Sequence, residues 1–457
     1  MRCNYRMIVL VLVTVFMAEF LSDVRVANSG FIASDLQGTW NHLGLISGDA
    51  PSQTPGWYWG TLSVDLNCNV SFTSPIFDSL GNSTYTPGGT TCNISPAGVV
   101  TFPGGYYRGV LARNKTVLFA SGTYAPGDIS DVSGYNLHIW VKSGGSFSTA
   151  DLQGTWNVHL LTSGDSPQYT GWAYGTTNIE SNGDSTWTSI TRSNGDSTLP
   201  SPRSYSITSN GIVSAAGFTS GHGVMSQDKN MIVVTANDGG GGYDLIIYQK
   251  SGGTFTAGDL QGTWNFHLLT SGDSPQWTGW AYGTSIFSSN GDLTPISITR
   301  SDGNSNLGPT RSFSITSDGI VSVAGSASFH GVMSQDKNMF VATANDGGGG
   351  YDLIIYLSSP RHPLVDFDGD GKTDVAVWRP STSMWYVLQS SDGQVKATRW
   401  GDSTDTVVPG DYDGDGKTDV AVRRPSNSMW YVLQSSDGQV RATRWGDSTD
   451  VPVKSRY

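Results

Sequence analysis

Two stretches near the C-terminus carry alternating aspartates. They read Asp366-Phe-Asp-Gly-Asp-Gly-Lys-Thr-Asp374 and Asp411-Tyr-Asp-Gly-Asp-Gly-Lys-Thr-Asp419. The alternation puts three carboxylates on one side of a tight loop, and the glycines allow the backbone to fold around an ion. Calcium is a hard cation that takes about six to eight oxygen ligands, which such loops supply. The predicted ligands are the side chains of Asp366, Asp368, Asp370 and Asp374 with the carbonyl of Lys372, and those of Asp411, Asp413, Asp415 and Asp419 with the carbonyl of Lys417.

These loops differ from the calcium loops that lie between two helices. An EF-hand is closed by a glutamate at its twelfth position, where this chain has Val377 and Val422. A dockerin-like site is disfavoured because no helical pattern follows either loop. The alternative is that each loop is a solvated acidic turn that holds no metal.

Strand-like segments follow both loops and repeat with them. Val375–Pro380 and Met384–Leu388 return as Val420–Pro425 and Met429–Leu433. From Val365 to Gly446 the chain resembles the FG-GAP/VCBS repeats of bacterial surface proteins, which are relatives of the calcium-binding blades of integrin α-subunit propellers. The resemblance implies one β-propeller blade per repeat, with the calcium loop joining strands at one edge.

The number of blades departs from that family. A propeller closes with about four to eight blades, whereas this chain contains about two. A third repeat begins at Val451-Pro-Val453 and gives Lys454-Ser-Arg-Tyr457 where an acidic loop is expected. The sequence therefore predicts an incomplete propeller, which is either a truncated product or pairs with another partner.

The rest of the chain is one module used three times. The hexapeptide Asp-Leu-Gln-Gly-Thr-Trp occurs at Asp35–Trp40, Asp151–Trp156 and Asp259–Trp264. In the second copy, eight short strand patterns are separated by Asn-Gly and related turns, which supply the positive φ of tight hairpins. A meander of eight strands that closes on itself leaves no exposed edge. We expect an all-β fold of three tandem eight-stranded antiparallel barrel-like modules, with a two-sheet sandwich as the alternative.

The start of each module looks like the first strand of lipocalin- and avidin-like barrels. In those barrels a Gly-x-Trp element closes one end, and here Gly38-Thr39-Trp40 and its two copies match it. The predicted divisions are a signal peptide at 1–29, barrel-like modules at 30–143, 144–251 and 252–359, and calcium-binding repeats at 360–457.

The N-terminal segment and the composition predict a protein that is outside the cytoplasm. Residues 1–29 have a basic start, a short apolar run and small residues at their end, as in a secretory signal peptide. The run is too short to span a bilayer, so no transmembrane segment is expected after cleavage; a retained anchor is the alternative. The net charge of −12 gives no basic footprint for nucleic acid or an anionic membrane. In an oxidising compartment Cys68 and Cys92 are expected to form a disulfide.

No catalytic constellation is apparent in the modules. His42, His159 and His267 are expected to occupy the same place in the first strand of each module, but nearby serines and aspartates are better explained as turn formers. We interpret these histidines as structural. The recurrent tryptophans are interpreted as core or barrel-mouth residues, with an aromatic floor for a sugar or an apolar ligand as the alternative: Trp57, Trp172 and Trp280.

These features favour a secreted or cell-surface calcium-binding protein that is not an enzyme. Its repeated modules would serve adhesion or recognition of an unknown extracellular ligand, such as a glycan or a surface protein, because repetition favours avidity. Two alternatives stay open. The chain is an accessory part of an extracellular hydrolase, or it is a carrier that holds a small ligand in each barrel.

Overall fold

A computed structural model describes most of the chain. It covers residues 31–452 except 49–54, 80–82, 86–87, 96, 106, 124–133, 165–169, 217–219, 239, 273–277, 360–364, 370–372, 414 and 416. The predicted signal peptide at 1–29 lies outside the described residues. Within them, no helix has the length and apolar character needed to cross a membrane.

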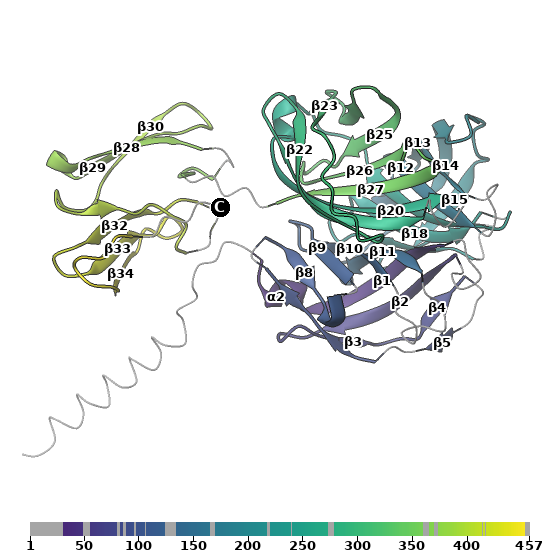
Figure 1. Ribbon diagram of the computed structural model, residues 1–457, viewed down its shortest axis with the longest axis horizontal. Coiled ribbons are helices and arrows are strands. Elements are labelled where there is room, and N and C mark those ends of the chain that lie inside the picture. Colours follow the sequence, from purple (N-terminus) through teal and green to yellow (C-terminus); the bar gives the residue numbers. More distant parts are fainter. Residues whose placement is uncertain are drawn as a thin grey trace, which may run out of the picture. The chain divides into compact units, whose positions relative to one another are not determined.

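The chain forms two compact units. One spans Ile32–Pro360 and the other includes Arg361–Tyr457. Both are built from antiparallel β-sheets, as the turn-rich sequence predicted. The first unit contains the three hexapeptide modules, and its strands are coloured from purple to green in Figure 1.

The second and third modules are closed barrels of eight antiparallel strands, each paired with its neighbour in sequence order and the last with the first. The second barrel follows helix α3 (Thr149–Leu152) and contains β12 (Gly154–Gly164), β13 (Gly171–Ile179), β14 (Asp184–Arg192), β15 (Arg203–Ile207), β16 (Ile212–Ala215), β17 (His222–Met225), β18 (Met231–Asn237) and β19 (Gly242–Lys250). The third follows the short helix η3 (Ala257–Asp259) and contains β20 (Gly262–Gly272), β21 (Gly279–Phe287), β22 (Asp292–Arg300), β23 (Arg311–Ile315), β24 (Ile320–Val323), β25 (Ser326–Met333), β26 (Met339–Asn345) and β27 (Gly350–Ser358). The barrel prediction is confirmed for both.

The first module forms a sheet of eleven shorter strands that is nearly a barrel. It follows α2 (Ala33–Leu36) and contains β1 (Gly38–Ser47), β2 (Gly56–Val64), β3 (Asn69–Phe72), β4 (Ile76–Asp78), β5 (Ser83–Tyr85), β6 (Thr90–Thr91), β7 (Asn93–Ile94), β8 (Val99–Thr101), β9 (Tyr107–Leu111), β10 (Val117–Thr123) and β11 (Tyr135–Lys142), with the helix η1 (Pro103–Gly105) before β9. The path of paired strands begins at β5 and ends at β7. In the described residues these two end strands do not pair, so the sheet stays open there.

The hexapeptide precedes and begins the first strand of each module. In the second barrel, Asp151 forms a salt bridge with Lys229 at 2.9 Å. Leu152 and Trp156 are fully buried, and the Trp156 indole N–H donates a hydrogen bond to the carbonyl of Leu152 at 2.7 Å. Gly154 has a φ of 132°, a conformation that favours glycine. The same indole hydrogen bonds form at Trp40 and Trp264. Four of the six residues therefore have structural roles that a barrel of this kind requires.

The three modules pack together as a closed ring. The first two strands of each module contact the last strands of another: β1 and β2 contact β18 and β19, β12 and β13 contact β26 and β27, and β20 and β21 contact β10 and β11. Each contact joins the first strands of one module to the last strands of another. The contacts form a closed ring because the third module also contacts the first. Hairpins at the junction add polar contacts, including Asn114 Nδ2 to Asp228 Oδ2 at 2.9 Å and Arg113 to Asn338 Oδ1 at 3.0 Å.

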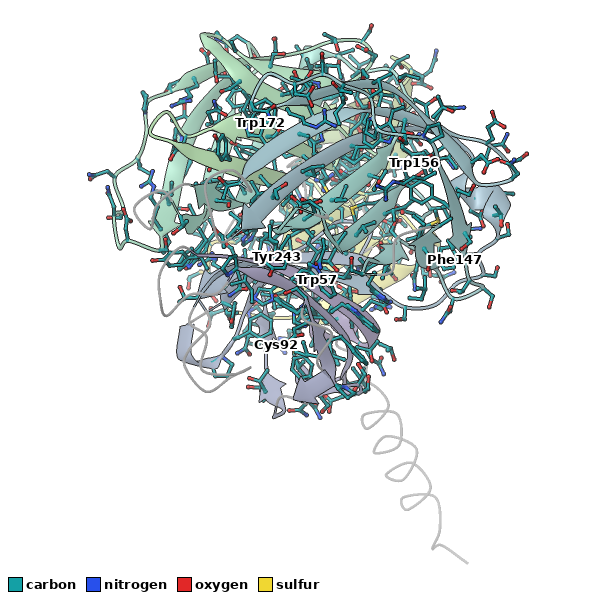
Figure 2. All side chains as sticks on the ribbon, turned by 90° about the vertical axis from the view of Figure 1, so that its right-hand side faces the viewer. Trp57, Cys92, Phe147, Trp156, Trp172 and Tyr243 are labelled. Carbon is teal, nitrogen blue, oxygen red and sulfur yellow. A yellow bond between two sulfur atoms is a disulfide. The ribbon has the colours of Figure 1, made fainter. Side chains whose placement is uncertain are left out.

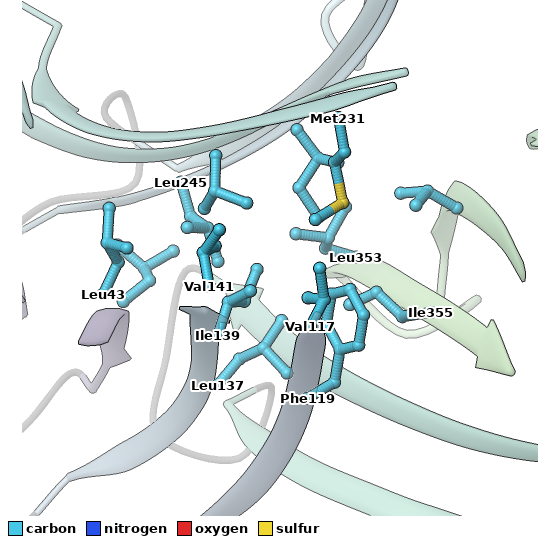
Figure 3. Close-up of a cluster of buried hydrophobic side chains, with 14 of the residues drawn as sticks. Leu43, Val117, Phe119, Leu137, Ile139, Val141, Met231, Leu245, Leu353 and Ile355 are labelled. Atoms are coloured by element: carbon cyan, nitrogen blue, oxygen red, sulfur yellow. The ribbon is translucent and has the colours of Figure 1, made fainter. Parts of the chain in front are cut away.

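An apolar core shared by all three modules fills the ring (Figure 3). On β19, Leu245 belongs to this shared core, whereas Ile246 and Tyr248 pack inside the barrel. The shared core therefore lies on the outer faces of the barrels. The sequence predicted tandem modules without predicting this core. Its fully buried members include Leu43, Phe119, Leu137, Ile139, Val233, Leu245, Leu269, Val341, Leu353 and Ile355.

The unit that includes residues 361–457 contains two small antiparallel sheets. The first has β28 (Val375–Arg379), β29 (Met384–Leu388) and β30 (Val395–Arg399), with η5 (Pro380–Thr382) between β28 and β29; the second has β31 (Thr406–Val407), β32 (Val420–Arg424), β33 (Met429–Leu433) and β34 (Val440–Arg444). Phe367 and Trp385 of the first repeat share an apolar cluster with Val422 of the second. The two repeats therefore pack against each other.

Candidate functional site

The first acidic loop brings three carboxylates together immediately before β28. One oxygen from each of Asp366, Asp368 and Asp374 lies within 4.8 Å of the others. Asp374 is held by two backbone N–H groups, from Phe367 at 2.7 Å and Ser390 at 2.8 Å. Backbone donors of this kind fix the carboxylate orientation without adding a positive charge. The predicted ligands Asp370 and Lys372 lie outside the described residues.

The second loop repeats this arrangement before β32. Oxygens of Asp411, Asp413 and Asp419 again lie within 4.8 Å of one another. Asp419 accepts the backbone N–H groups of Tyr412 at 2.8 Å and Ser435 at 2.7 Å, which are the counterparts of the donors to Asp374. Two loops of the same sequence thus build the same carboxylate cluster.

Asp415 and Lys417 occupy the remaining predicted positions of the second loop. Asp415 accepts a hydrogen bond from the Ser435 hydroxyl at 2.9 Å and another from the Lys417 backbone N–H at 2.8 Å. Its carboxylate is directed to these donors and is outside the three-oxygen cluster. The structure therefore unites three of the four predicted side-chain ligands in this loop.

The carboxylates of the second loop lie close enough to affect one another. Burial raises the pKa of Asp419, the N–H donors from Ser435 and Tyr412 oppose that shift, and the nearby charge of Asp413 adds to it. Converging carboxylates repel one another, and a divalent cation relieves the repulsion. The donor set consists of hard oxygen atoms, which suits calcium. The three clustered carboxylates of each loop fit such an ion.

The recurrent tryptophans lie at the contacts between modules. The Trp57 indole N–H donates to Asn237 Oδ1 at 2.5 Å, across from the first module to the second. Trp172 donates to Asn345 Oδ1 in the third module at 2.6 Å, and Trp280 donates to Thr123 Oγ1 in the first at 2.8 Å. Figure 2 shows Trp57 and Trp172 on the ribbon. Trp57 and Trp172 are buried, as the interpretation as core residues expects, and all three indoles donate hydrogen bonds from one module to another.

Two of the three first-strand histidines also lie at contacts between modules. His159 Nε2 lies 3.1 Å from Nδ1 of His330 in the third module, and His267 Nδ1 lies 2.9 Å from the Ser121 hydroxyl in the first. Both are buried, and burial lowers the pKa of His267 to about 3. Their partners are neutral side chains at the contacts between modules.

His42 is not equivalent to the other two, which corrects the prediction that all three share one place. Across the sheet His159 faces Tyr174 and His267 faces Tyr282, whereas Leu43 faces Trp59 at the same register. His42 is one residue earlier, so its side chain points to the opposite face. It lies inside the first barrel, with Nε2 at 2.8 Å from Nδ1 of His138.

Sequence reasoning missed the polar interior of the first barrel. Gly44 pairs with Tyr58 across the sheet, while the other two barrels have Leu opposite Ala at that register. A side chain at residue 44 would overlap the Tyr58 hydroxyl, so the glycine admits the tyrosine ring to the interior. The sequence did contain a signal for this difference. The first module has a small residue followed by a large one, Gly44 and Tyr58, where the other modules have leucine and alanine. Cys68 and Cys92 form a disulfide in the same module, near the open part of its sheet.

Comparison with known sequences yields one family. Residues 366–422 match the family described as FG-GAP-like repeat. The match confirms the predicted repeat over that part of the chain. No curated protein matches the sequence.

Several solved structures are distantly similar to this chain. A protein of unknown function from the DUF3598 family of Nostoc punctiforme is 13% identical with a TM-score of 0.21, covering 46% of this chain and 99% of its own. Isotype 1 transferrin binding protein B from Neisseria meningitidis is 8% identical with a TM-score of 0.22, covering 70% and 76%. Apo AztD from Citrobacter koseri is 11% identical with a TM-score of 0.14, covering 90% and 96%. Scores this low assign no shared function, and the resemblance to lipocalin- and avidin-like barrels gains no support from them.

Proposed function

We propose that this chain is a secreted or cell-surface protein that binds calcium through its C-terminal repeats and uses its barrels, without catalysis, for adhesion or ligand recognition. The observation that carries the proposal is the pair of matching carboxylate clusters in the two acidic loops. The arrangement appears twice, with matching backbone donors to Asp374 and Asp419, so the same kind of ion would suit both loops.

The expected effect of calcium is local. An ion bound by Asp411, Asp413 and Asp419 would tie the loop to the strands on either side of it, because Asp419 immediately precedes β32 and accepts a hydrogen bond from Ser435 after β33. The ion would therefore stabilise the second sheet, and the first loop would do the same for β28 and β29. Calcium would then control whether the repeats present a rigid surface.

The barrels supply a rigid body for recognition. Because their outer faces share a core, the three modules hold fixed positions in the ring and cannot act as flexible spacers. Corresponding surfaces are presented three times at set orientations, an arrangement that suits a multivalent ligand such as a glycan or a surface protein. The disulfide between Cys68 and Cys92 is compatible with an extracellular location.

Calorimetric titration of the full chain with calcium tests the metal part of the proposal. We expect two ions per chain, with one lost in Asp374→Asn and one lost in Asp419→Asn. Asp392→Asn and Asp437→Asn are matched controls, since each removes the same charge from an exposed position in the same repeats. Equal calcium binding by the site variants and the controls would contradict the proposal.

Retention on immobilised glycans and on cells tests the recognition part. We expect the full chain to be retained in calcium and released by a chelator, and Asp374→Asn/Asp419→Asn to be retained weakly in both. Retention that is unaffected by chelator would separate recognition from the metal sites and refute the calcium dependence.

A further inference from the structure

The interior of the first barrel differs chemically from the other two. Its cross-strand neighbours include His138 opposite Gly44, where the second barrel has Ile246 opposite Leu160. His42 takes the place that is Val158 in the second barrel and Phe266 in the third. The second and third barrels are therefore filled mainly by hydrocarbon and aromatic side chains, whereas the first encloses two imidazoles and a phenol.

Three polar atoms from three strands converge inside this barrel. Nε2 of His42 on β1 lies 2.8 Å from Nδ1 of His138 on β11, and the Tyr58 hydroxyl on β2 also lies within hydrogen-bond distance of that Nδ1. A single ring nitrogen carries either one lone pair or one proton. It therefore cannot form two full hydrogen bonds, one to an imidazole and one to a phenol. The structure thus brings two imidazole nitrogens and a phenol oxygen together at one place, and these are atom types that bind metal ions.

The surroundings keep both imidazoles neutral. Burial lowers the pKa of His42 to about 3. Burial also lowers the pKa of His138, and the neighbouring His42 adds to that effect. Neutral imidazole is the form that coordinates metals. Nδ1 of His42 is buried without a hydrogen-bond partner, so the present contacts leave the polar capacity of this residue incompletely used.

Aromatic rings enclose the three atoms. The ring of Tyr107 stands at 87° to that of His138 with centroids 4.6 Å apart, and the rings of Phe72 and Trp140 lie 6.0 and 5.8 Å from that of His42. The low dielectric of such a wall strengthens metal–ligand attraction and excludes competing water. In the described residues this is also the module whose end strands, β5 and β7, do not pair.

We propose that His42, His138 and Tyr58 bind a divalent transition-metal ion of the copper and zinc class inside the first barrel. Two imidazoles and a phenol form a borderline donor set, distinct from the hard carboxylate oxygens of the calcium loops. Metal–nitrogen distances are about 2.0–2.1 Å, so the ion replaces the shared hydrogen bonds with a small outward shift of the side chains. On binding, the Tyr58 hydroxyl releases its proton to solvent and coordinates as phenolate, which offsets one unit of the metal charge.

Copper(II) is the probe of choice because it binds nitrogen and oxygen donors most tightly among the divalent first-row metals. The full chain is incubated with copper(II) in excess calcium, which occupies the carboxylate loops, and is then dialysed. Bound copper is measured by elemental analysis and by electron paramagnetic resonance. We expect one tightly held copper per chain, with hyperfine coupling to imidazole nitrogen and a phenolate-to-copper absorption band.

The other barrels provide matched substitutions. His42→Val and His138→Ile introduce the residues that the second barrel has at these positions, and we expect the double variant to lose the tight copper. His159→Leu is the control, since it introduces the residue of the first barrel at a histidine outside the cluster. Copper content that is the same in the double variant and the wild type would overturn the proposal, because it would place the ion elsewhere.

Tyr58→Phe separates coordination from packing. Phenylalanine keeps the ring that fills the space beside Gly44, so the barrel is expected to fold with an unchanged circular dichroism spectrum. The variant should lose the phenolate band and bind copper at least about tenfold more weakly, a change of about 1.4 kcal/mol. An absorption band and affinity equal to those of the wild type would remove Tyr58 from the site and refute the three-ligand assignment.

Discussion

Leu353 tests whether the three barrels share one core. It lies on β27, is fully buried, and belongs to the apolar cluster between the modules (Figure 3). In an isolated barrel this outer position would face water, and its truncation would change stability by less than about 0.5 kcal/mol. In the ring, Leu353→Ala removes buried methyl groups and leaves a cavity, which costs about 2–5 kcal/mol. The two arrangements therefore predict effects that differ severalfold.

Urea unfolding followed by tryptophan fluorescence and circular dichroism measures the difference. The matched control is Ile296→Ala in the same barrel, where the side chain is 51% exposed. We expect Leu353→Ala to lower the free energy of unfolding of the Ile32–Pro360 unit by about 2–5 kcal/mol and the control to change it by less than about 0.5 kcal/mol. Equal, small losses in both variants would refute the shared core.

Three further predictions follow from single contacts. Replacing Cys68 and Cys92 by serine should lower the stability of the first barrel by about 3 kcal/mol, measured as a lower melting temperature under oxidising conditions; an unchanged value would show that the bridge adds nothing. Trp172→Phe should cost about 0.5–1.5 kcal/mol because it removes the hydrogen bond to Asn345, and a double-mutant cycle with Asn345→Ala should show coupling, whereas additive effects would argue against the contact. Burial raises the pKa of Asp352 from 3.8 to about 7, so between these pH values the native state binds a proton that the unfolded state has lost. The free energy of unfolding of the wild type should therefore fall relative to that of Asp352→Asn as the pH rises from about 4 to about 7. A difference between the two proteins that does not change with pH would contradict this.

The sequence predicted the barrels well because their signals are local. Asn-Gly turns set the hairpins, and the hexapeptide contains its own cap, positive-φ glycine and buried tryptophan. The shared core depends on contacts between modules, which no local pattern specifies. One signal was nevertheless present. Segments such as Leu245-Ile-Ile-Tyr248 are apolar on both faces, which an isolated barrel with a solvated outer surface does not need.

The candidate sites were predicted in part for the same reason. The spacing of Asp411, Asp413 and Asp419 places three oxygens together, but the direction taken by Asp415 depends on Ser435 in a later turn. The polar cluster in the first barrel requires knowing that His42 is shifted by one position relative to His159. The shift itself can be read from the sequence, because His42 lies two residues after Trp40 whereas His159 lies three residues after Trp156. Its meeting with His138 and Tyr58 depends on the strand pairing, which no local pattern specifies.

Thermal unfolding of the full chain in calcium and then in chelator tests the calcium claim most directly. An ion that binds only the folded loops must raise their stability by mass action. We predict that a transition of the C-terminal repeats moves to higher temperature in calcium while the transition of the barrels stays in place, and that Asp374→Asn/Asp419→Asn abolishes the shift. Identical unfolding in calcium and in chelator would contradict calcium binding by the two loops.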